Sequence, residues 1–306
     1  MLLTANRELI NISICICTRK RQEGLRRLLD SLENLEASPQ TNVRIIVIEN
    51  DIKNLSESIV KEFSGKGKFE IRYFLEPRQG IVFARNRSIA EAGECDFCCF
   101  TDDDQIVSSD WLIELLKCQR EFNADGVTGL TQPSFTKTVP AYIKKFHQLD
   151  TYPYGTIVKS AFTGCLLLRK KYLDLLNGPF DVRLNFSGGE DCLLTEGITE
   201  LGGKIRFNPN AIAYEFIPES RTKIEFVIKR TYRTANTRLF IKSIKDQKFK
   251  KTKELPKLIT RMGYGLLIVL PLLIFGKASR LKGLIKIVNA AGGFAFVFGI
   301  RSQFYK

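Results

Sequence analysis

Strand-like and helix-like segments alternate four times between residues 11 and 122, and this alternation limits the fold more than any other feature of the sequence. Short apolar runs rich in β-branched residues or cysteine lie at residues 11–18, 42–50, 69–76 and 96–104. Each is followed by a segment with apolar residues at helical spacing, at residues 23–35, 54–64, 80–93 and 111–122. This order predicts an α/β fold with an open, mostly parallel sheet and helices on both of its faces.

Polar residues follow every one of these four strand-like runs. They are Thr18 and Arg19, then Glu49, Asn50 and Asp51, then Glu76, and last Asp102, Asp103 and Asp104. In sheets of this class the carboxyl ends of parallel strands meet at one edge, and ligands bind there. We therefore expect these side chains to line a single binding site.

The three consecutive aspartates suggest a metal. Carboxylate oxygens are the ligands that Mg²⁺ and Mn²⁺ prefer, and Mg²⁺ is commonly held by one or two carboxylates together with substrate phosphates. Asp102 and Asp104 are thus candidate ligands of a divalent cation that assists the departure of a diphosphate. The alternative is a solvated turn in which Ser108 or Ser109 caps the next helix.

Two further motifs carry charge that could take part in chemistry. GGED, at residues 188–191, places Glu190 and Asp191 at a helix start, where a carboxylate could take a proton from an incoming hydroxyl or could simply cap the helix. Arg85 and Arg87 could bind a diphosphate, because arginine forms bidentate contacts with phosphate oxygens. Their alternative is a solvated helix face.

The alternation weakens after residue 131. Residues 160–176 predict a strand followed by a helix, and residues 205–209 and 211–218 predict two further strands. We expect one catalytic domain over residues 1–220, with a half for the activated donor at about 1–131 and a half for the acceptor at about 132–220.

Charge sets the rest of the chain apart. Residues 1–220 carry 27 Lys and Arg against 30 Asp and Glu, a net charge of −3, whereas residues 221–306 carry 20 against 3, a net charge of +17. Such a basic tail is expected to meet an anionic surface, either membrane lipid or nucleic acid.

The tail also contains two apolar runs, at residues 262–275 and 284–300. The first is short for a transmembrane helix and contains Pro271, and the second contains Lys286 and Asn289. These features predict a basic, partly hydrophobic helical hairpin that is interfacial or re-entrant on anionic lipid. The alternative is a soluble helical pair packed on the catalytic domain. The N-terminus shows no signal-peptide pattern, so we expect a cytoplasmic protein at the inner face of the plasma membrane.

Taken together, seven motifs give the chain a resemblance to the family 2 glycosyltransferases, which are inverting enzymes of the GT-A fold. The motifs are CTRKRQEGLRRLLDSL, VIENDIKN, EPRQGIVFARNRSIAEA, FTDDDQ, FTGCLLLRKKYL, GPFDVRL and GGEDCLL. They stand in the expected order over residues 11–217, and their sequences resemble those of bacterial exopolysaccharide glucosyltransferases of the succinoglycan type. The later PESRTKIEFVIKRTYRTAN fits that subgroup too.

The resemblance implies roles for particular residues. The residues implied to bind the nucleotide-sugar are Thr18, Arg19, Glu49, Asp51, Arg85, Asp102 and Asp103. Asp102 and Asp104 would form the metal-binding DxD motif, Asp191 would be the general base beside Glu190, and Gly164 would let the backbone approach the acceptor. Two positions depart from the family: Glu49 stands where Asp is frequent, and no histidine follows the last core strand. There Glu215 could replace it as a metal ligand, or a third ligand could be absent.

The implied activity is transfer of a sugar from a nucleotide-sugar, UDP-linked by expectation, with Mg²⁺ or Mn²⁺. The expected acceptor is a hydroxyl of a polyprenyl-diphosphate-linked saccharide or a surface polysaccharide. One rival is a sugar-phosphate nucleotidyltransferase, which usually has a glycine-rich N-terminal loop that CTRKRQ lacks. The other is a nucleic-acid binder, but adjacent aspartates would repel phosphate, so we expect no nucleic-acid partner.

Overall fold

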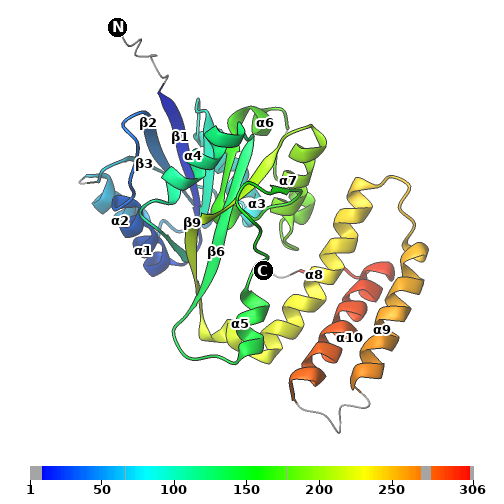
Figure 1. Cartoon of the computed structure of the whole chain (residues 1–306). Helices are drawn as coiled ribbons and strands as arrows, with labels where there is room; N and C mark the ends of the chain where they lie inside the picture. Colours follow the sequence, from blue (N-terminus) through cyan, green and yellow to red (C-terminus); the bar gives the residue numbers. More distant parts are fainter. Residues whose placement is uncertain (1–8, 66, 177, 270–276, 304–306) are drawn as a thin grey trace. The chain divides into compact units, whose positions relative to one another are not determined.

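In the computed structural model of the protein, the structure describes residues 9–65, 67–176, 178–269 and 277–303 (Figure 1). The chain forms two compact units. One consists of Met1–Ser134, Gln148–Asn185 and Glu190–Phe216, and the other of Phe135–His147, Phe186–Gly189 and Ile217–Lys306.

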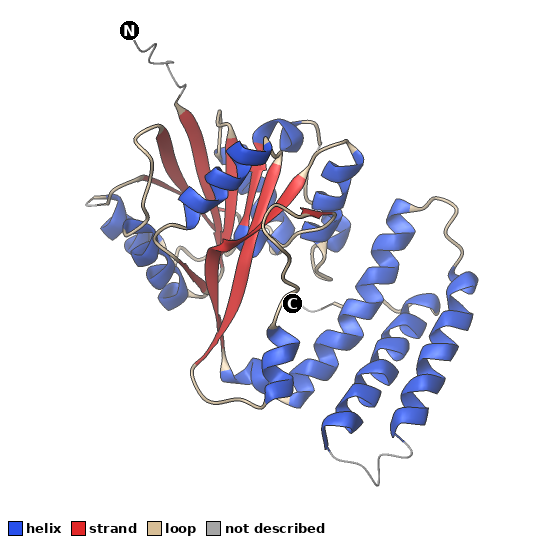
Figure 2. Ribbon diagram, viewed as in Figure 1, coloured by secondary structure: helices blue, strands red, loops and turns tan. Residues whose placement is uncertain are grey.

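The first unit is built on a mixed sheet, shown in red in Figure 2. Its strands are β1 (Ile10–Thr18), β2 (Thr41–Glu49), β3 (Glu70–Leu75), β4 (Phe97–Asp102), β5 (Gln105–Val107), β6 (Gly126–Phe135), β7 (Ile157–Val158), β8 (Leu166–Arg169) and β9 (Ile205–Ile217). The order is β3-β2-β1-β4-β8-β6-β9-β5, and β7 pairs with β9. The strands β1 to β4 are parallel, whereas β8 is antiparallel to β4 and to β6, and β9 is antiparallel to β5 and β7.

Helices cover both faces of this sheet, which confirms the expected α/β fold. They are α1 (Gln22–Glu33), α2 (Glu57–Ser64), α3 (Ile81–Glu91), α4 (Trp111–Phe122), α6 (Lys170–Asp174) and α7 (Glu190–Glu200). Side chains alternate between the faces of a strand. On β1, Ile12, Ile14 and Ile16 join a core with residues of α1, α2 and α4, whereas Cys15 joins a second core with residues of α3, α6 and α7.

The parallel strands end level with one another. Thr18 at the end of β1 is in register with Glu49 at the end of β2, and Cys17 is in register with Asp102 at the end of β4. The polar residues that follow these strands therefore lie at one edge of the sheet, as predicted.

Two boundaries differ from the predictions. The strands expected at 205–209 and 211–218 are one strand, β9, so the prediction of two was wrong. Pro209 lies between the residues that pair with β7 and those that pair with β5, and so does not interrupt either pairing. The fourth strand-like run ends at Asp102, because Asp103 and Asp104 form a turn that leads directly into β5.

The second unit is helical, as the basic tail predicted. It contains α5 (Ala141–His147), α8 (Ile224–Lys245), α9 (Leu255–Val269) and α10 (Lys277–Val297), and α10 packs against both α8 and α9. Helices α9 and α10 approach closely at Gly265 and Gly283, where a Cβ on either glycine would lie 3.1 Å from the carbonyl oxygen of the other. Pro271, expected to interrupt the first apolar run, lies outside the described residues. Within the described ranges no helix combines the length and the apolar character needed to cross a membrane.

Candidate active site

The turn between β4 and β5 holds the three aspartates at the edge of the sheet. Asp103 is buried, and its Oδ1 accepts a hydrogen bond of 2.8 Å from Arg21 Nη1. The same Arg21 atom donates to Asp104 Oδ2 at 3.0 Å. Burial raises the pKa of Asp103 to about 6, and Arg21 opposes that rise. Arg21 thus neutralises two carboxylates of the turn, a role that the sequence reasoning missed although the cluster TRKRQ contains this residue.

A second arginine joins the two acidic motifs. The guanidinium of Arg85, on the second turn of α3, donates to Glu190 through Nη1 and to Asp102 Oδ1 through Nη2 at 3.2 Å. Arg85 is only 7 % exposed, so the alternative of a solvated helix face is wrong for this residue. Arg87 is less buried, since its side chain is 41% exposed, and it pairs with Glu91 one turn further along the helix.

Glu190 and Asp191 occupy the first turn of α7, and their environments differ. Glu190 is buried and bound to Arg85, and its Oε2 has no hydrogen-bond partner among the described residues. Asp191 is half-buried, and its Oδ1 accepts a hydrogen bond of 2.7 Å from the backbone N–H of Cys192. Burial raises the pKa of both carboxyl groups, and the positive charge of Arg85 opposes this. A carboxylate with a raised pKa and an accessible oxygen is suited to accept a proton.

The loop before α3 is held by two asparagines. Asn50 Oδ1 accepts a hydrogen bond of 2.7 Å from the N–H of Gly80, and Asn185 Oδ1 accepts one of 3.1 Å from the N–H of Val82. Gly80 has a φ of +133°, and a Cβ there would lie 2.0 Å from side-chain atoms of Asn185. Only glycine fits this position, which fixes the start of the helix that carries Arg85. Asn50 was singled out from the sequence, but Asn185 lies more than 100 residues away from Gly80 and was missed.

Gly164 lies beside the aspartate turn. A Cβ at this position would lie 2.6 Å from Gln105 Nε2 and 3.4 Å from Asp102 Oδ2. Gln105 is buried, and its Oε1 accepts hydrogen bonds from the hydroxyl of Thr101 at 2.9 Å and from the N–H of Asp102 at 3.1 Å. The missing side chain of Gly164 therefore leaves room for the amide that holds the backbone of Asp102.

Of the four residues predicted at the ends of β1 and β2, Glu49 and Thr18 are buried, whereas Asp51 and Arg19 are more exposed. Glu49 is fully buried and accepts hydrogen bonds from the Ser56 N–H at 2.8 Å and from the hydroxyl of Tyr73. Thr18 is also buried, and its carbonyl accepts a hydrogen bond of 2.8 Å from the N–H of Asn50.

Asp51 lies nearer the surface. Arg19 Nε and Lys20 Nζ are each 3.8 Å from its Oδ2. The Lys53 N–H, followed by the charges of Lys20 and Arg19, lowers the pKa of Asp51. The carboxylate of Asp51 is therefore ionised and sits beside two cations at the outer end of the strand edge.

Glu215 reaches the same edge through the antiparallel half of the sheet, because it is in register with Gln105 of β5. The adjoining Phe216 N–H donates to the carbonyl of Asp104 at 2.8 Å. Even so, no three His, Cys, Asp or Glu side chains of the described residues converge into a ready-made metal site. The side chains of Asp102 and Asp104 are 37% and 18% exposed, and each has one carboxylate oxygen bound to an arginine, Arg85 and Arg21 respectively.

The fold and the site at the strand edge define a GT-A glycosyltransferase. Comparison with known proteins agrees with this class. Residues 13–176 match the family described as Glycosyl transferase family 2. The chain belongs to this family and is a glycosyltransferase. The resemblance drawn from its motifs is thereby confirmed, and the nucleotidyltransferase reading is not supported.

Among individual proteins, the chain is similar to the succinoglycan biosynthesis protein ExoM of Rhizobium meliloti (strain 1021). The two are 33% identical over 233 residues, which is 75% of this chain and 74% of that protein. The fold of this chain is similar to that of the mannosyltransferase PcManGT from Pyrobaculum calidifontis, solved with GDP-Man and Mn²⁺. The TM-score is 0.65 at 15% identity, over 94% of this chain and 87% of that chain. The fold is also similar to that of S. aureus TarS 1-349 in complex with UDP-GlcNAc, with a TM-score of 0.53 at 15% identity over 97% and 93% of the two chains.

Proposed function

We propose that the protein transfers a sugar from a nucleotide-sugar to an acceptor hydroxyl with inversion at the anomeric carbon. The observation that carries this proposal is the position of Arg85, whose guanidinium binds Asp102 of the aspartate turn and Glu190 of the GGED motif. A donor-binding motif and an acid–base motif are thereby joined at the carboxyl edge of a parallel sheet, where ligands of such folds bind.

The donor would lie along this edge. Thr18, Arg19, Glu49 and Asp51, at the ends of β1 and β2, would surround the base and ribose. Asp102, Asp103 and Arg85 would lie toward the diphosphate and sugar. The buried Oε1 of Glu49 has no hydrogen-bond partner among the described residues, so a donor N–H or O–H reaching it would satisfy an otherwise unpaired buried oxygen.

A divalent cation fits the residues of the turn. Asp102 and Asp104 supply carboxylate oxygens from one turn, and Mg²⁺ or Mn²⁺ is commonly completed by substrate phosphates rather than by protein alone. When bound, the ion offsets the negative charge that builds up on the leaving diphosphate. PcManGT, of similar fold, was solved with Mn²⁺ and a nucleotide-sugar, which supports this choice of cation. Glu215 is the candidate third ligand.

Asp191 is the proposed general base, and Glu190 positions Arg85. As the acceptor oxygen forms its bond to the anomeric carbon, the bond from that carbon to the diphosphate oxygen breaks, and the hydroxyl proton passes to Asp191. A single displacement of this kind inverts the anomeric centre. Asp191 suits the role better than Glu190, because Glu190 is buried and committed to Arg85.

The proposed donor is a UDP-sugar, and the proposed acceptor is a polyprenyl-diphosphate-linked saccharide or a surface polysaccharide at the cytoplasmic face of the membrane. The UDP-GlcNAc bound in TarS supports a UDP donor, whereas the GDP-Man bound in PcManGT makes GDP-sugars the necessary comparison. The succinoglycan biosynthesis named for ExoM supports a polysaccharide acceptor.

Calorimetric titration with UDP-, GDP- and dTDP-sugars, in Mn²⁺ and in chelator, tests the donor and the metal. We expect one donor to bind tightly only with metal, and Asp104→Ala to lose that metal dependence. Unchanged Mn²⁺-dependent affinity in Asp104→Ala would remove this residue from the metal site.

A transfer assay with the donor so identified tests the base. Asp191→Asn should bind donor normally but turn over about 10²- to 10⁴-fold more slowly. The matched control is Asp174→Asn, which removes a carboxylate that is 56% exposed and pairs with Lys170 of its own helix. Loss of donor affinity in Asp191→Asn, with turnover otherwise retained, would take Asp191 out of the base role.

A further inference from the structure

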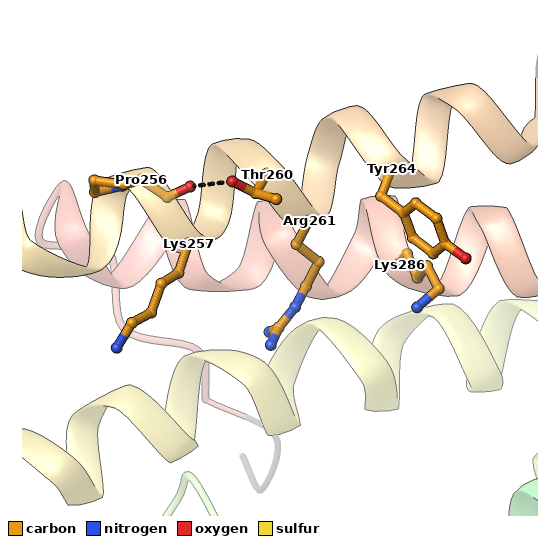
Figure 3. A pocket seen from close by; sticks show the side chains of 6 residues that line it. All are labelled: Pro256, Lys257, Thr260, Arg261, Tyr264 and Lys286. Carbon is orange, nitrogen blue, oxygen red and sulfur yellow. Dashed lines mark hydrogen bonds between the residues drawn. The ribbon is translucent and has the colours of Figure 1, made fainter.

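A cationic groove lies between α9 and α10. It has a volume of about 470 Å³ and is lined by Pro256, Lys257, Thr260, Arg261, Tyr264 and Lys286. Figure 3 shows that the charged ends of Lys257, Arg261 and Lys286 are directed to the same side of α9. Lys286 Nζ also lies 4.7 Å from the centre of the Tyr264 ring, so the aromatic ring and the ammonium group form one wall.

The positive charge of this groove is poorly compensated. No Asp or Glu occurs between residues 255 and 297. Among the described residues, no carboxylate forms an ion pair with Arg261 or Lys286, and Arg261 instead donates to the amide oxygen of Asn289. Lys257 lies 4.0 Å from Glu254, but that carboxylate is already paired with Lys242. Cations gathered without counter-charge attract an anion, and two lysines with one arginine suit phosphate oxygens.

The rest of the exposed side of α9 is apolar. Ile259, Leu266 and Leu267 are 61%, 44% and 69% exposed. Residues seven or eight apart lie on the same side of a helix, so these three form one apolar strip, and Leu267 is one turn from Tyr264. Leu258 and Gly265 face the other way and are buried in the helical unit. The exposed surface of α9 is therefore divided between an apolar strip and a cationic groove.

We propose that this groove binds the phosphate of an anionic membrane phospholipid, with the apolar strip of α9 in contact with the acyl region. A ligand with an anionic head and an apolar tail matches both halves of the surface, and basic amphipathic helices with exposed leucine bind membranes in this way. The half-exposed Tyr264, with an apolar ring and a polar hydroxyl, is a residue type found at membrane–water boundaries. Nucleic acid would explain the charge but would leave the apolar strip in water. The site is separate from the proposed transfer chemistry and does not depend on it.

The test is binding of the full chain to vesicles of phosphatidylcholine alone and of phosphatidylcholine mixed with phosphatidylglycerol, measured by co-sedimentation. Each cation near an anionic lipid surface strengthens binding about fivefold, so Arg261→Gln with Lys286→Gln should weaken binding to the mixed vesicles about 30-fold. The matched control is Lys229→Gln with Lys248→Gln, which removes the same charge from two exposed lysines outside the groove. It should change binding less than about fivefold.

Two further variants separate the groove from general charge. Arg261→Lys with Lys286→Arg keeps the charge and should retain binding, whereas Ile259→Gln with Leu267→Gln keeps every cation and should still weaken it. Circular dichroism of each variant establishes that the helices are intact. Donor binding measured by calorimetry should be unchanged throughout, so that failure of this site and failure of the transferase assignment give different results.

Three outcomes would overturn the proposal. Equal losses in the groove variant and its matched control would mean non-specific adhesion of a basic surface. Binding of inorganic diphosphate that depends on Arg261 and Lys286, without vesicle binding, would mean a site for a soluble anion. Tighter, groove-dependent binding to single-stranded RNA than to vesicles would mean a nucleic-acid surface.

Discussion

Replacing Arg85 by methionine should destabilise the first unit strongly, because this side chain is the counter-charge of a buried carboxylate. The side chains of Arg85 and Glu190 are 9% and 7% exposed. Removing one partner of a buried ion pair leaves the other charge uncompensated and costs about 3–5 kcal/mol. The pair with Asp102 adds less than about 1 kcal/mol, since that carboxylate is 37% exposed and solvent screens it.

The lower end of this range applies to Arg85→Met. Burial already raises the pKa of Glu190, so without Arg85 the carboxyl can take up a proton instead of remaining charged. We therefore expect a loss of about 3 kcal/mol near neutral pH, or about 6–12 °C in the unfolding midpoint. When a carboxyl group has a higher pKa in the folded state than in the unfolded state, the protein loses stability as pH rises. The stability lost in Arg85→Met should therefore shrink as pH is lowered toward the unfolded-state pKa of about 4.3.

Fluorescence of Trp111 is a suitable probe for urea and thermal unfolding. It is the one tryptophan of the chain and is fully buried in the core of the first unit. Arg87→Met on the same helix is the matched control, because its surface pair with Glu91 contributes about 0.3–0.5 kcal/mol. The double variant Arg85→Met/Glu190→Met replaces the ion pair by apolar groups and should recover stability to within about 1 kcal/mol of the parent protein.

If Arg85→Met costs no more stability than Arg87→Met, Glu190 does not rely on Arg85 inside the fold, and this prediction is wrong. Additive losses in the double variant would refute it equally, because two groups that interact directly must show a coupling energy.

Two other predictions concern packing and proton binding. Gly164→Ala should destabilise the protein by about 1–3 kcal/mol and weaken donor binding in calorimetry, because the new methyl group displaces Gln105. The control Gly197→Ala meets no atom within 4 Å and lies in a helix, so a gain of up to about 1 kcal/mol is expected, and equal effects of the two would contradict the account. Burial, together with the nearby charges of Arg221 and Arg230, lowers the pKa of His147. The unfolded chain then binds the proton more tightly, so stability should fall as pH drops below about 6.5, and His147→Gln should lessen that fall in pH-dependent thermal unfolding.

The sequence predicted the first half of the fold well, because each helix and strand there has a clear pattern within its own residues. An apolar run that predicts a strand, or apolar residues at helical spacing, can be recognised from a single segment. The alternation of such strands and helices implies that the strands are parallel. The antiparallel half gave weaker signals. Pro209 divides β9 into two apparent strands, since nothing local shows that its two ends pair with different partners.

In the site, too, local patterns predicted some features and not others. That Asp102 and Glu49 would share an edge could be inferred, because both follow strands that the pattern makes parallel. Which charges would pair could not be inferred: Arg21 and Asp103 are 82 residues apart, and Arg85 and Glu190 are 105 apart. An arginine on a helix is solvated by default, since a buried charge is stable only with a partner. Its burial therefore becomes predictable only after the order of the strands has placed a carboxylate beside it.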